Sequence, residues 1–131
     1  MVTIKSFTDR PQSKVLAEIL PIESADMFLA LNGTLPVMSK YIDNGLVTAD
    51  DTAIPCWSLA ALLQVLPLGI YDEFDNCDYE LEIDMIDKMP RYIRLGDIYH
   101  SQFPYDFEKD TLLDNIVESI IWLNDNNYFE L

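Results

Sequence analysis

The sequence predicts an α+β fold with two layers, in which about three helices pack on one face of an antiparallel sheet built from two β-hairpins. Three observations predict this class. Acidic and apolar residues alternate strictly from Asp78 to Met85, which is the pattern of a half-buried strand. The dipeptide Asn32-Gly33 separates two short apolar runs, as in a two-residue hairpin turn. Apolar residues repeat at helical spacing between Leu112 and Ile121.

The length of the chain predicts a single domain over residues 1–131. Half of the residues are apolar, which is enough for one sizeable core, and the chain is short for two. This apolar content also argues against disorder, despite the net charge of −15.

The first helix is expected after Thr8 or Asp9, either of which can cap it, with Pro11 in its opening turn and Pro21 at its end. Its apolar stripe consists of Val15, Leu16, Ile19 and Leu20. A hairpin then follows with arms at residues 27–31 and 34–38, and Pro36 restricts the second arm to a sheet edge. Residues 39–53 show no sustained period and predict a loop.

A second helix is expected from Pro55 through residues 56–66, which are apolar nearly all round. The uncharged run from Ile54 to Tyr71 is long enough to raise the question of a membrane span, but Pro67 and Gly69 interrupt it. Its helical part would rise about 18 Å, against a hydrocarbon layer of about 30 Å. The segment therefore predicts a buried core helix and no membrane partner.

The second hairpin contains the acidic strand. Between Asp72 and Asp87 the chain carries eight carboxylates and no base. Alternation directs four apolar side chains toward a core, namely Tyr79, Leu81, Ile83 and Met85. A turn at residues 87–90, with a loop of three or five residues, would place Arg94 opposite Glu82 or Asp84. One base leaves most of the acids without a partner, so we expect a negative face.

The last third of the chain predicts a surface crossing and a final helix. Residues 98–108 are rich in aromatics and prolines, which is typical of a connection across the surface. Asp110 is expected to cap a helix that continues to about Asn124, where the Asn-Asp-Asn-Asn run ends it. Tyr128 and Phe129 are expected to return the tail to the core.

The charge distribution limits the classes of partner that the protein can bind. Acids and bases balance through residue 40, so the whole net charge of −15 falls after it. We therefore expect no direct nucleic-acid partner and no anionic membrane surface, whereas a basic protein would be attracted. The same charge disfavours close self-association, so a monomer or weak homodimer is expected. Two cysteines and an N-terminus without a secretory apolar core favour a reducing, cytoplasmic setting.

The sequence contains no recognisable catalytic or metal-binding motif. His100 is the only histidine, Cys56 falls in a segment expected to be buried, and the four glycines are too scattered for a phosphate loop. The stretch from Asp72 to Asp78 is dense in oxygen ligands but lacks the glycine and terminal glutamate of a calcium-binding loop. We expect no enzymatic activity, no cofactor and no metal.

Two core-like segments carry a family resemblance. Residues 17–27 and the run IPCWSLAALL at residues 54–63 resemble a family of short bacterial proteins found among accessory genes of gut bacteria and their mobile elements. That family also ends in an amphipathic helix, similar here to residues 114–124. The family has no established activity, so the resemblance implies a shared fold and transfers no catalytic residue.

Two classes of function follow from the sequence. The first is a protein-interaction module that binds a basic protein, with mimicry of nucleic acid as its most specific form. Its candidate residues are Asp78, Glu80, Glu82 and Asp84 on the strand, with Asp72, Glu73 and Asp75 before it. The alternative is a small-molecule or ion-binding domain with an aromatic pocket. That pocket would consist of Trp57, Tyr99, His100, Phe103, Tyr105 and Phe107. High salt should weaken the first class of binding far more than the second.

Overall fold

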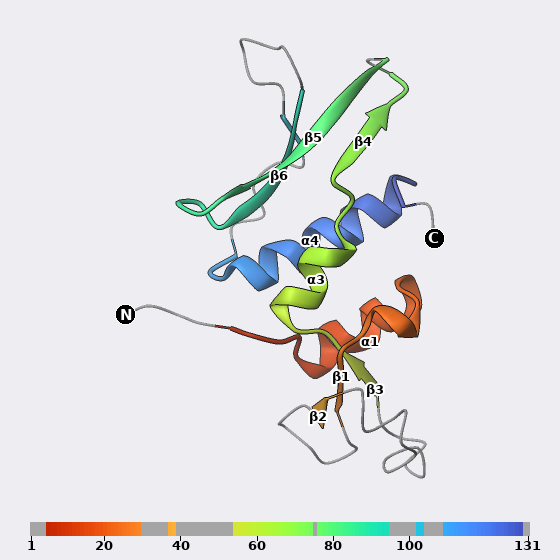
Figure 1. Ribbon diagram of the computed structural model, residues 1–131, viewed down its shortest axis with the longest axis vertical. Coiled ribbons are helices and arrows are strands. Elements are labelled where there is room, and N and C mark those ends of the chain that lie inside the picture. Colours follow the sequence, from red (N-terminus) through yellow and green to blue (C-terminus); the bar gives the residue numbers. More distant parts are fainter. Residues whose placement is uncertain are drawn as a thin grey trace. The chain divides into compact units, whose positions relative to one another are not determined.

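The computed structural model describes residues 5–29, 37–38, 54–74, 76–94, 102–103 and 109–129, with backbone only at 37–38 and 102–103. The chain divides into two compact units, one of residues 5–65 with residue 131, and one of residues 66–130 with residues 1–4. We call them the N-terminal and C-terminal units. Helices and antiparallel strands occur in both, so the α+β class is confirmed (Figure 1).

The strands form two sheets, and not the single sheet that the sequence predicts. The sheet of the N-terminal unit has the order β2 (Val37–Met38), β1 (Met27–Leu29), β3 (Ile54–Cys56). That of the C-terminal unit has the order β4 (Gly69–Asp72), β5 (Cys77–Asp84), β6 (Met89–Arg94), β7 (Gln102–Phe103). Each predicted hairpin gains strands from segments that carried no strand signal. The added strands are only two to four residues long, which is too short for a hydrophobic period to mark them in the sequence.

The N-terminal unit opens with α1, Arg10–Ile19, as predicted. Asp9 caps it in a capping box: its carboxylate accepts the N–H of Gln12 at 2.9 Å, and the Gln12 side chain accepts the N–H of Asp9 at 3.1 Å. Leu16 and Leu20 of the predicted stripe are buried, whereas Val15 is exposed. A short 3₁₀ turn, Ile22–Ser24, follows the helix.

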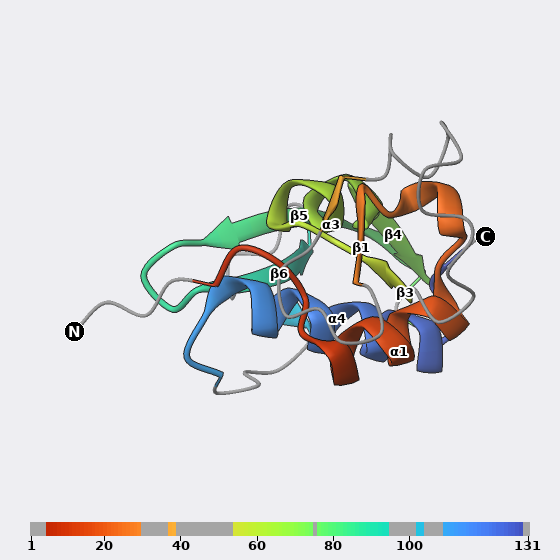
Figure 2. The ribbon, with the colours of Figure 1, turned by 90° about the horizontal axis from the view of Figure 1, so that it is seen from below.

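Strands β1, Met27–Leu29, and β2, Val37–Met38, pair with Phe28 opposite Val37. This is the register that the predicted two-residue turn requires, although Asn32, Gly33 and Pro36 lie outside the described residues. The predicted loop at residues 39–53 lies outside them as well. Figures 1 and 2 show β1 beside β3, with α1 next to them.

The prediction of a helix from Pro55 is wrong at its start. Residues Ile54–Cys56 form strand β3, which pairs with β1 and places Met27 opposite Cys56. Pro55 is tolerated because β3 is an edge strand of the described sheet. Helix α3 covers only Leu59–Val65, and the Ser58 hydroxyl accepts the N–H of Ala61 at 3.1 Å at its start.

The C-terminal unit contains strands β4, Gly69–Asp72, β5, Cys77–Asp84, β6, Met89–Arg94, and β7, Gln102–Phe103. Strand β5 confirms the predicted acidic strand. Of the expected surface crossing at residues 98–108, only β7 is described, and it pairs with β6. Helix α4, Leu112–Asp125, packs against β6 (Figure 1).

The predicted register of the second hairpin is wrong. The turn occupies residues 85–88, so Glu82 lies opposite Arg91 and Tyr79 lies opposite Arg94. A loop of four residues has the opposite parity to one of three or five, so the base on the acidic face is Arg91. Met85 is in the turn and is 67% exposed, so it does not enter the core as expected. Tyr79 is buried, and Leu81 and Ile83 are half-buried.

Helix α4 confirms the predicted final helix, with one correction at its start. The cap is Thr111, and not Asp110 as the sequence predicts. The Thr111 hydroxyl accepts the N–H of Asp114 at 3.1 Å. The helix ends at the asparagine run, and Asn127 adopts a left-handed backbone conformation with φ 61°. The Tyr128 ring then stacks on Trp122 with 5.5 Å between ring centroids. None of the helices described here is long and apolar enough to cross a membrane.

Candidate functional site

The carboxylates of β5 form the most distinctive surface feature of the C-terminal unit. We define the acidic row as Asp78, Glu80, Glu82 and Asp84, which alternate along β5 on one face of the sheet. Asp78, Glu80 and Glu82 are exposed, and Asp84 is half-buried. Neighbouring members are separated by roughly 6.7 Å along the strand. The structure thus brings the four predicted strand acids together on one side.

Arg91 is the base on this face, and it is already occupied at one end of the row. Its guanidinium nitrogens lie 2.7 Å from Asp84 Oδ2 and 3.2 Å from Asp87 Oδ2. The Arg91 side chain is 12% exposed, which limits its approach to any outside partner. Glu82 is its cross-strand neighbour but shares no ion pair with it.

Asp84 also organises the β5–β6 turn. One carboxylate oxygen accepts the backbone N–H groups of Ile86 at 2.9 Å and Asp87 at 3.2 Å. The hydrogen bond from Asp87 is the largest cause that lowers the pKa of Asp84, and Arg91 lowers it further. The Asp84 carboxylate therefore has its hydrogen-bonding and ion-pair partners within the protein, and its role in the acidic row is structural.

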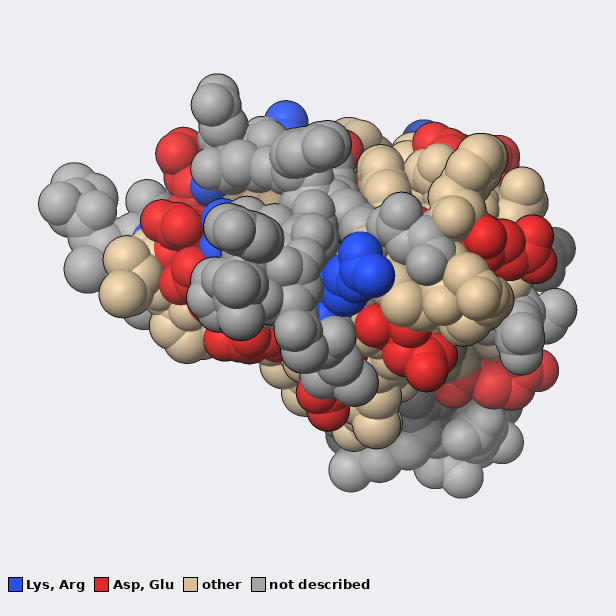
Figure 3. Space-filling view, turned by 90° about the horizontal axis from the view of Figure 1, so that it is seen from above, with Lys and Arg blue, Asp and Glu red and all other residues tan. Residues whose placement is uncertain are grey.

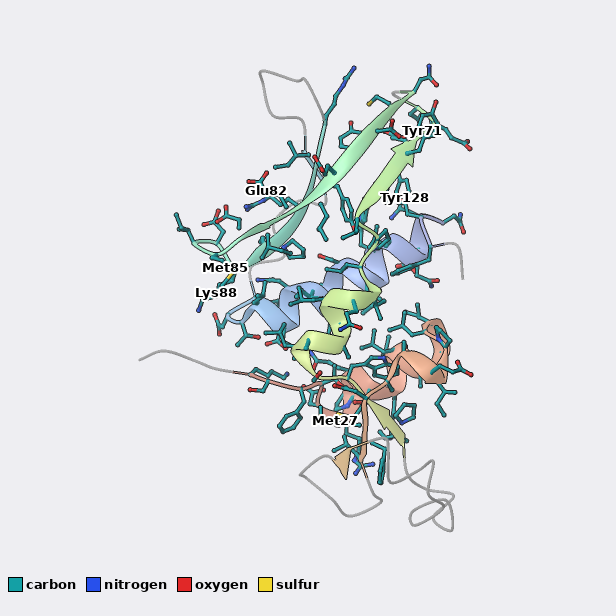
Figure 4. The ribbon with its side chains drawn as sticks, viewed as in Figure 1. Met27, Tyr71, Glu82, Met85, Lys88 and Tyr128 are labelled. Atoms are coloured by element: carbon teal, nitrogen blue, oxygen red, sulfur yellow. The ribbon has the colours of Figure 1, made fainter. Side chains whose placement is uncertain are left out.

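The other three carboxylates have no such partners. Among the residues that the structure describes, none donates a hydrogen bond to the side-chain carboxylates of Asp78, Glu80 or Glu82, and none forms an ion pair with them. Every lysine and arginine except Lys40 lies in that part of the chain. We call Asp78, Glu80 and Glu82 the open carboxylates. In Figure 4 the labelled Glu82 lies along β5, away from the labelled Lys88 in the turn.

Apolar side chains flank the acidic row at both ends. Phe74, in the turn between β4 and β5, is fully exposed, and Ile86, in the turn between β5 and β6, is 92% exposed. Met85 lies beside Ile86 in the same turn. Figure 3, which views the molecule from above, shows acidic side chains toward both sides of the visible face and a basic group between them.

The acids before β5 contribute unequally. Asp72 ends β4, is half-buried, and accepts the N–H of Phe74 at 3.1 Å, so its carboxylate serves the turn. Glu73 is exposed in that turn. Asp75 lies outside the described residues. The Tyr71 hydroxyl donates to the Asn76 side chain, which closes the turn across the end of the hairpin (Figure 4).

A buried asparagine supports the turn that carries Met85 and Ile86. The Asn115 side chain in α4 donates to the carbonyl of Lys88 at 2.7 Å and to that of Lys109 at 3.3 Å. Its oxygen accepts the N–H of Lys109 at 3.2 Å. Asn115 is completely buried, and sequence reasoning missed it. The available signal was a polar residue on the apolar stripe of an amphipathic helix.

The aromatic pocket that the sequence offered as an alternative is described only in part. Trp57 is fully buried in the N-terminal unit, where its indole N–H donates to Ser24 Oγ at 2.9 Å. Phe103 contributes only its backbone, in β7. The remaining members lie outside the described residues: Tyr99, His100, Tyr105 and Phe107.

Cys56 belongs to a buried hydrogen-bonded cluster next to Trp57. Its thiol lies 3.4 Å from the Thr8 carbonyl oxygen and accepts the Thr8 hydroxyl at 3.5 Å, and Thr8 also contacts the Ser13 hydroxyl at 2.8 Å. Burial raises the pKa of the Cys56 thiol, so the protonated form is favoured. This thiol is a packed core group and not an activated nucleophile.

Within the described ranges, no three His, Cys, Asp or Glu side chains come together in a way that would hold a metal ion. Comparison of the chain with protein-family models, curated proteins and solved structures found no match. The family resemblance given above therefore stays a prediction, and any function has to be argued from the geometry of the site.

Proposed function

We propose that the protein is a non-enzymatic interaction module that binds a basic protein surface through the open carboxylates of β5. The observation that carries this proposal is the exposure of Asp78, Glu80 and Glu82 in a line, with no described cation in an ion pair with any of them. Neighbouring charges about 6.7 Å apart repel one another by roughly 0.6 kcal/mol in water. A cationic partner would remove that repulsion on binding.

The sheet supports the proposal because it holds the row in a fixed geometry. Strand β5 lies between β4 and β6, so both of its edges are hydrogen-bonded. Three charges on a rigid strand bind a matching row of bases with less loss of side-chain and backbone entropy than charges on a flexible loop. The ends of the row add apolar contacts through Phe74 and Ile86.

Apolar groups at the two ends favour a protein as the partner over a small cation. A metal ion or polyamine would engage carboxylates and leave Phe74, Met85 and Ile86 in water. A protein surface with bases between apolar groups would cover both kinds of contact. We place this interaction in the cytoplasm, and the free thiols of Cys56 and Cys77 support a reducing setting.

The test is an affinity capture of host-cell proteins on three forms of the purified chain, at low and at high salt. The row variant carries Asp78→Asn, Glu80→Gln and Glu82→Gln. The control variant carries Glu18→Gln, Glu23→Gln and Asp125→Asn, which removes three exposed carboxylates outside the row. Both variants lose the same charge, so their comparison separates the row from net charge.

A basic partner that the parent and the control variant retain, that salt releases and that the row variant fails to retain would support the proposal. Equal capture by the row and control variants would overturn it, because the binding would then follow net charge alone.

A further inference from the structure

Strand β4 has one edge that no other described strand pairs with. It is the end strand in the order β4-β5-β6-β7, and its only pairing in the described part of the chain is with β5. Antiparallel pairs alternate between hydrogen-bonded and non-hydrogen-bonded residues. The Leu81 N–H donates to the Leu68 carbonyl at 2.9 Å, which fixes that alternation. Leu68, Ile70 and Asp72 therefore bond to β5, and Gly69 and Tyr71 direct their N–H and C=O groups outward.

The same two residues lie on the acidic face. Gly69 is opposite Glu80, and Tyr71 is opposite Asp78. Residues directly opposite one another share a face, so the open edge and two of the open carboxylates are presented on one side. The other face of the edge is apolar: Ile70 is buried there, and Leu68 before it is 80% exposed.

This arrangement specifies what an added strand would look like. In antiparallel pairing, the residues that bond to Gly69 and Tyr71 place their side chains on the acidic face. The residues between them place theirs beside Leu68 and Ile70. A fitting segment therefore alternates basic residues with β-branched apolar ones.

Gly69 makes room for the basic residue. It has no side chain, so a lysine or arginine paired with it can extend across the strand toward Glu80, whose strand is roughly 10 Å from the added one. The second basic residue would lie beside Tyr71, whose half-exposed ring can contact the cation through its face.

We propose that the β4 edge accepts an extended antiparallel segment of a partner protein in which basic and β-branched apolar residues alternate. This inference rests on the proposed function and adds backbone pairing to it. A second copy of the chain is the less suitable occupant, because pairing two β4 edges would bring Asp72 and the acidic row of one copy toward those of the other.

The test uses the full chain and the peptide acetyl-Lys-Val-Lys-Val-Lys-Val-Lys-amide. Two further peptides differ only in N-methylation, one at the second and third lysines and one at the second and third valines. All three have the same charge. In the proposed register, the lysine N–H groups pair with β4 and the valine N–H groups face away.

Binding is measured by NMR titration at low salt, together with amide hydrogen exchange. We expect the lysine-methylated peptide to bind at least tenfold more weakly than the unmethylated one, and the valine-methylated peptide to bind within about threefold of it. Exchange at Gly69 and Tyr71 should slow at least tenfold with peptide bound, while exchange at Ile70 and Asp72 should change little.

Equal binding of the two methylated peptides, or unchanged exchange at Gly69 and Tyr71, would overturn strand addition and leave charge-based binding in place. The unmethylated peptide is also titrated into the row variant and the control variant. If it does not bind the parent, or if it binds the two variants equally, the proposed function and the inference are both overturned.

Discussion

The side-chain nitrogen of Asn115 donates a 2.7 Å hydrogen bond to the carbonyl oxygen of Lys88, joining the interior of α4 to the last residue of the β5–β6 turn. Lys88 has a left-handed backbone conformation with φ 56°. A lysine in this conformation carries a steric cost, and the bond from Asn115 helps to hold it. The turn that carries Met85 and Ile86, at one end of the acidic row, thus depends on a polar side chain in the core.

Replacing Asn115 by alanine should destabilise the protein by about 1–3 kcal/mol, because the buried side chain and the backbone groups of Lys88 and Lys109 lose their hydrogen bonds. Urea denaturation followed by circular dichroism measures the change. Asn124→Ala, at an exposed site on the same helix, is the control and should stay within about 0.5 kcal/mol of the parent. A similar loss in both variants would contradict the role of Asn115.

The carboxyl of Asp84 should titrate below its ordinary pKa of 3.8. Its folded pKa is depressed, so its contribution to stability is present above 3.8 and is lost as the pH falls through the lowered value. The variant Asp84→Asn should therefore lose less stability than the parent across that acid range. Unfolding measured from pH 6 down to pH 2 tests this, and equal acid loss in the two proteins would contradict it.

Arg91→Met should raise the pKa of Asp84 only part of the way to 3.8. The larger cause of the depression is the backbone N–H of Asp87, which this substitution leaves in place. Carbon-detected NMR titration of the Asp84 carboxyl measures the shift. A return of the pKa to 3.8 or above would mean that Arg91, and not the turn, sets it.

The two cysteines should differ in reactivity. Cys56 is fully buried and its pKa is raised by burial, whereas Cys77 is partly exposed at the start of β5. A maleimide reagent at pH 8 should label Cys77 in the native protein and Cys56 only after unfolding. Mass spectrometry of the labelled peptides gives the result, with Cys77→Ser as the control. Native labelling of Cys56 at a rate similar to that of Cys77 would contradict its burial.

Asp26 and Ser58 should be energetically coupled. The Asp26 carboxylate accepts the backbone N–H of Ser58 at 2.9 Å and its hydroxyl at 2.5 Å, while that hydroxyl caps α3. Asp26→Ala should cost about 1–3 kcal/mol and Ser58→Ala about 1 kcal/mol. The double variant should cost about 1 kcal/mol less than the sum of the two. Strict additivity in urea denaturation would contradict the coupling.

Elements with a clear hydrophobic period could be predicted from the sequence. Helix α1 combines Asp9 with a stripe through Leu16, and β5 has its acid–apolar alternation. The start of α3 could not be predicted in this way. Residues 54–57 are apolar without a period, and the extended form of β3 depends on partners far along the chain, as in the pairing of Met27 with Cys56.

The open carboxylates were predicted, but their cationic neighbour was not. The hairpin register depends on the Asp84 carboxylate in the turn and on the left-handed Lys88, where no glycine or asparagine marks the position. Because the loop has four residues and not three or five, Arg91 lies on the acidic face in place of the predicted Arg94. The open edge of β4 was also beyond the sequence, because strand order follows from long-range pairing.

The most direct test of the proposed function is the affinity of the captured partner for the row variant and for the control variant, measured by calorimetry at one low salt concentration. Three ion pairs at about 0.2–1 kcal/mol each correspond to roughly a tenfold change in Kd. We predict that the row variant binds about tenfold more weakly than the parent and that the control variant stays within twofold of it. Equal affinities of the two variants would contradict the assignment of binding to the open carboxylates.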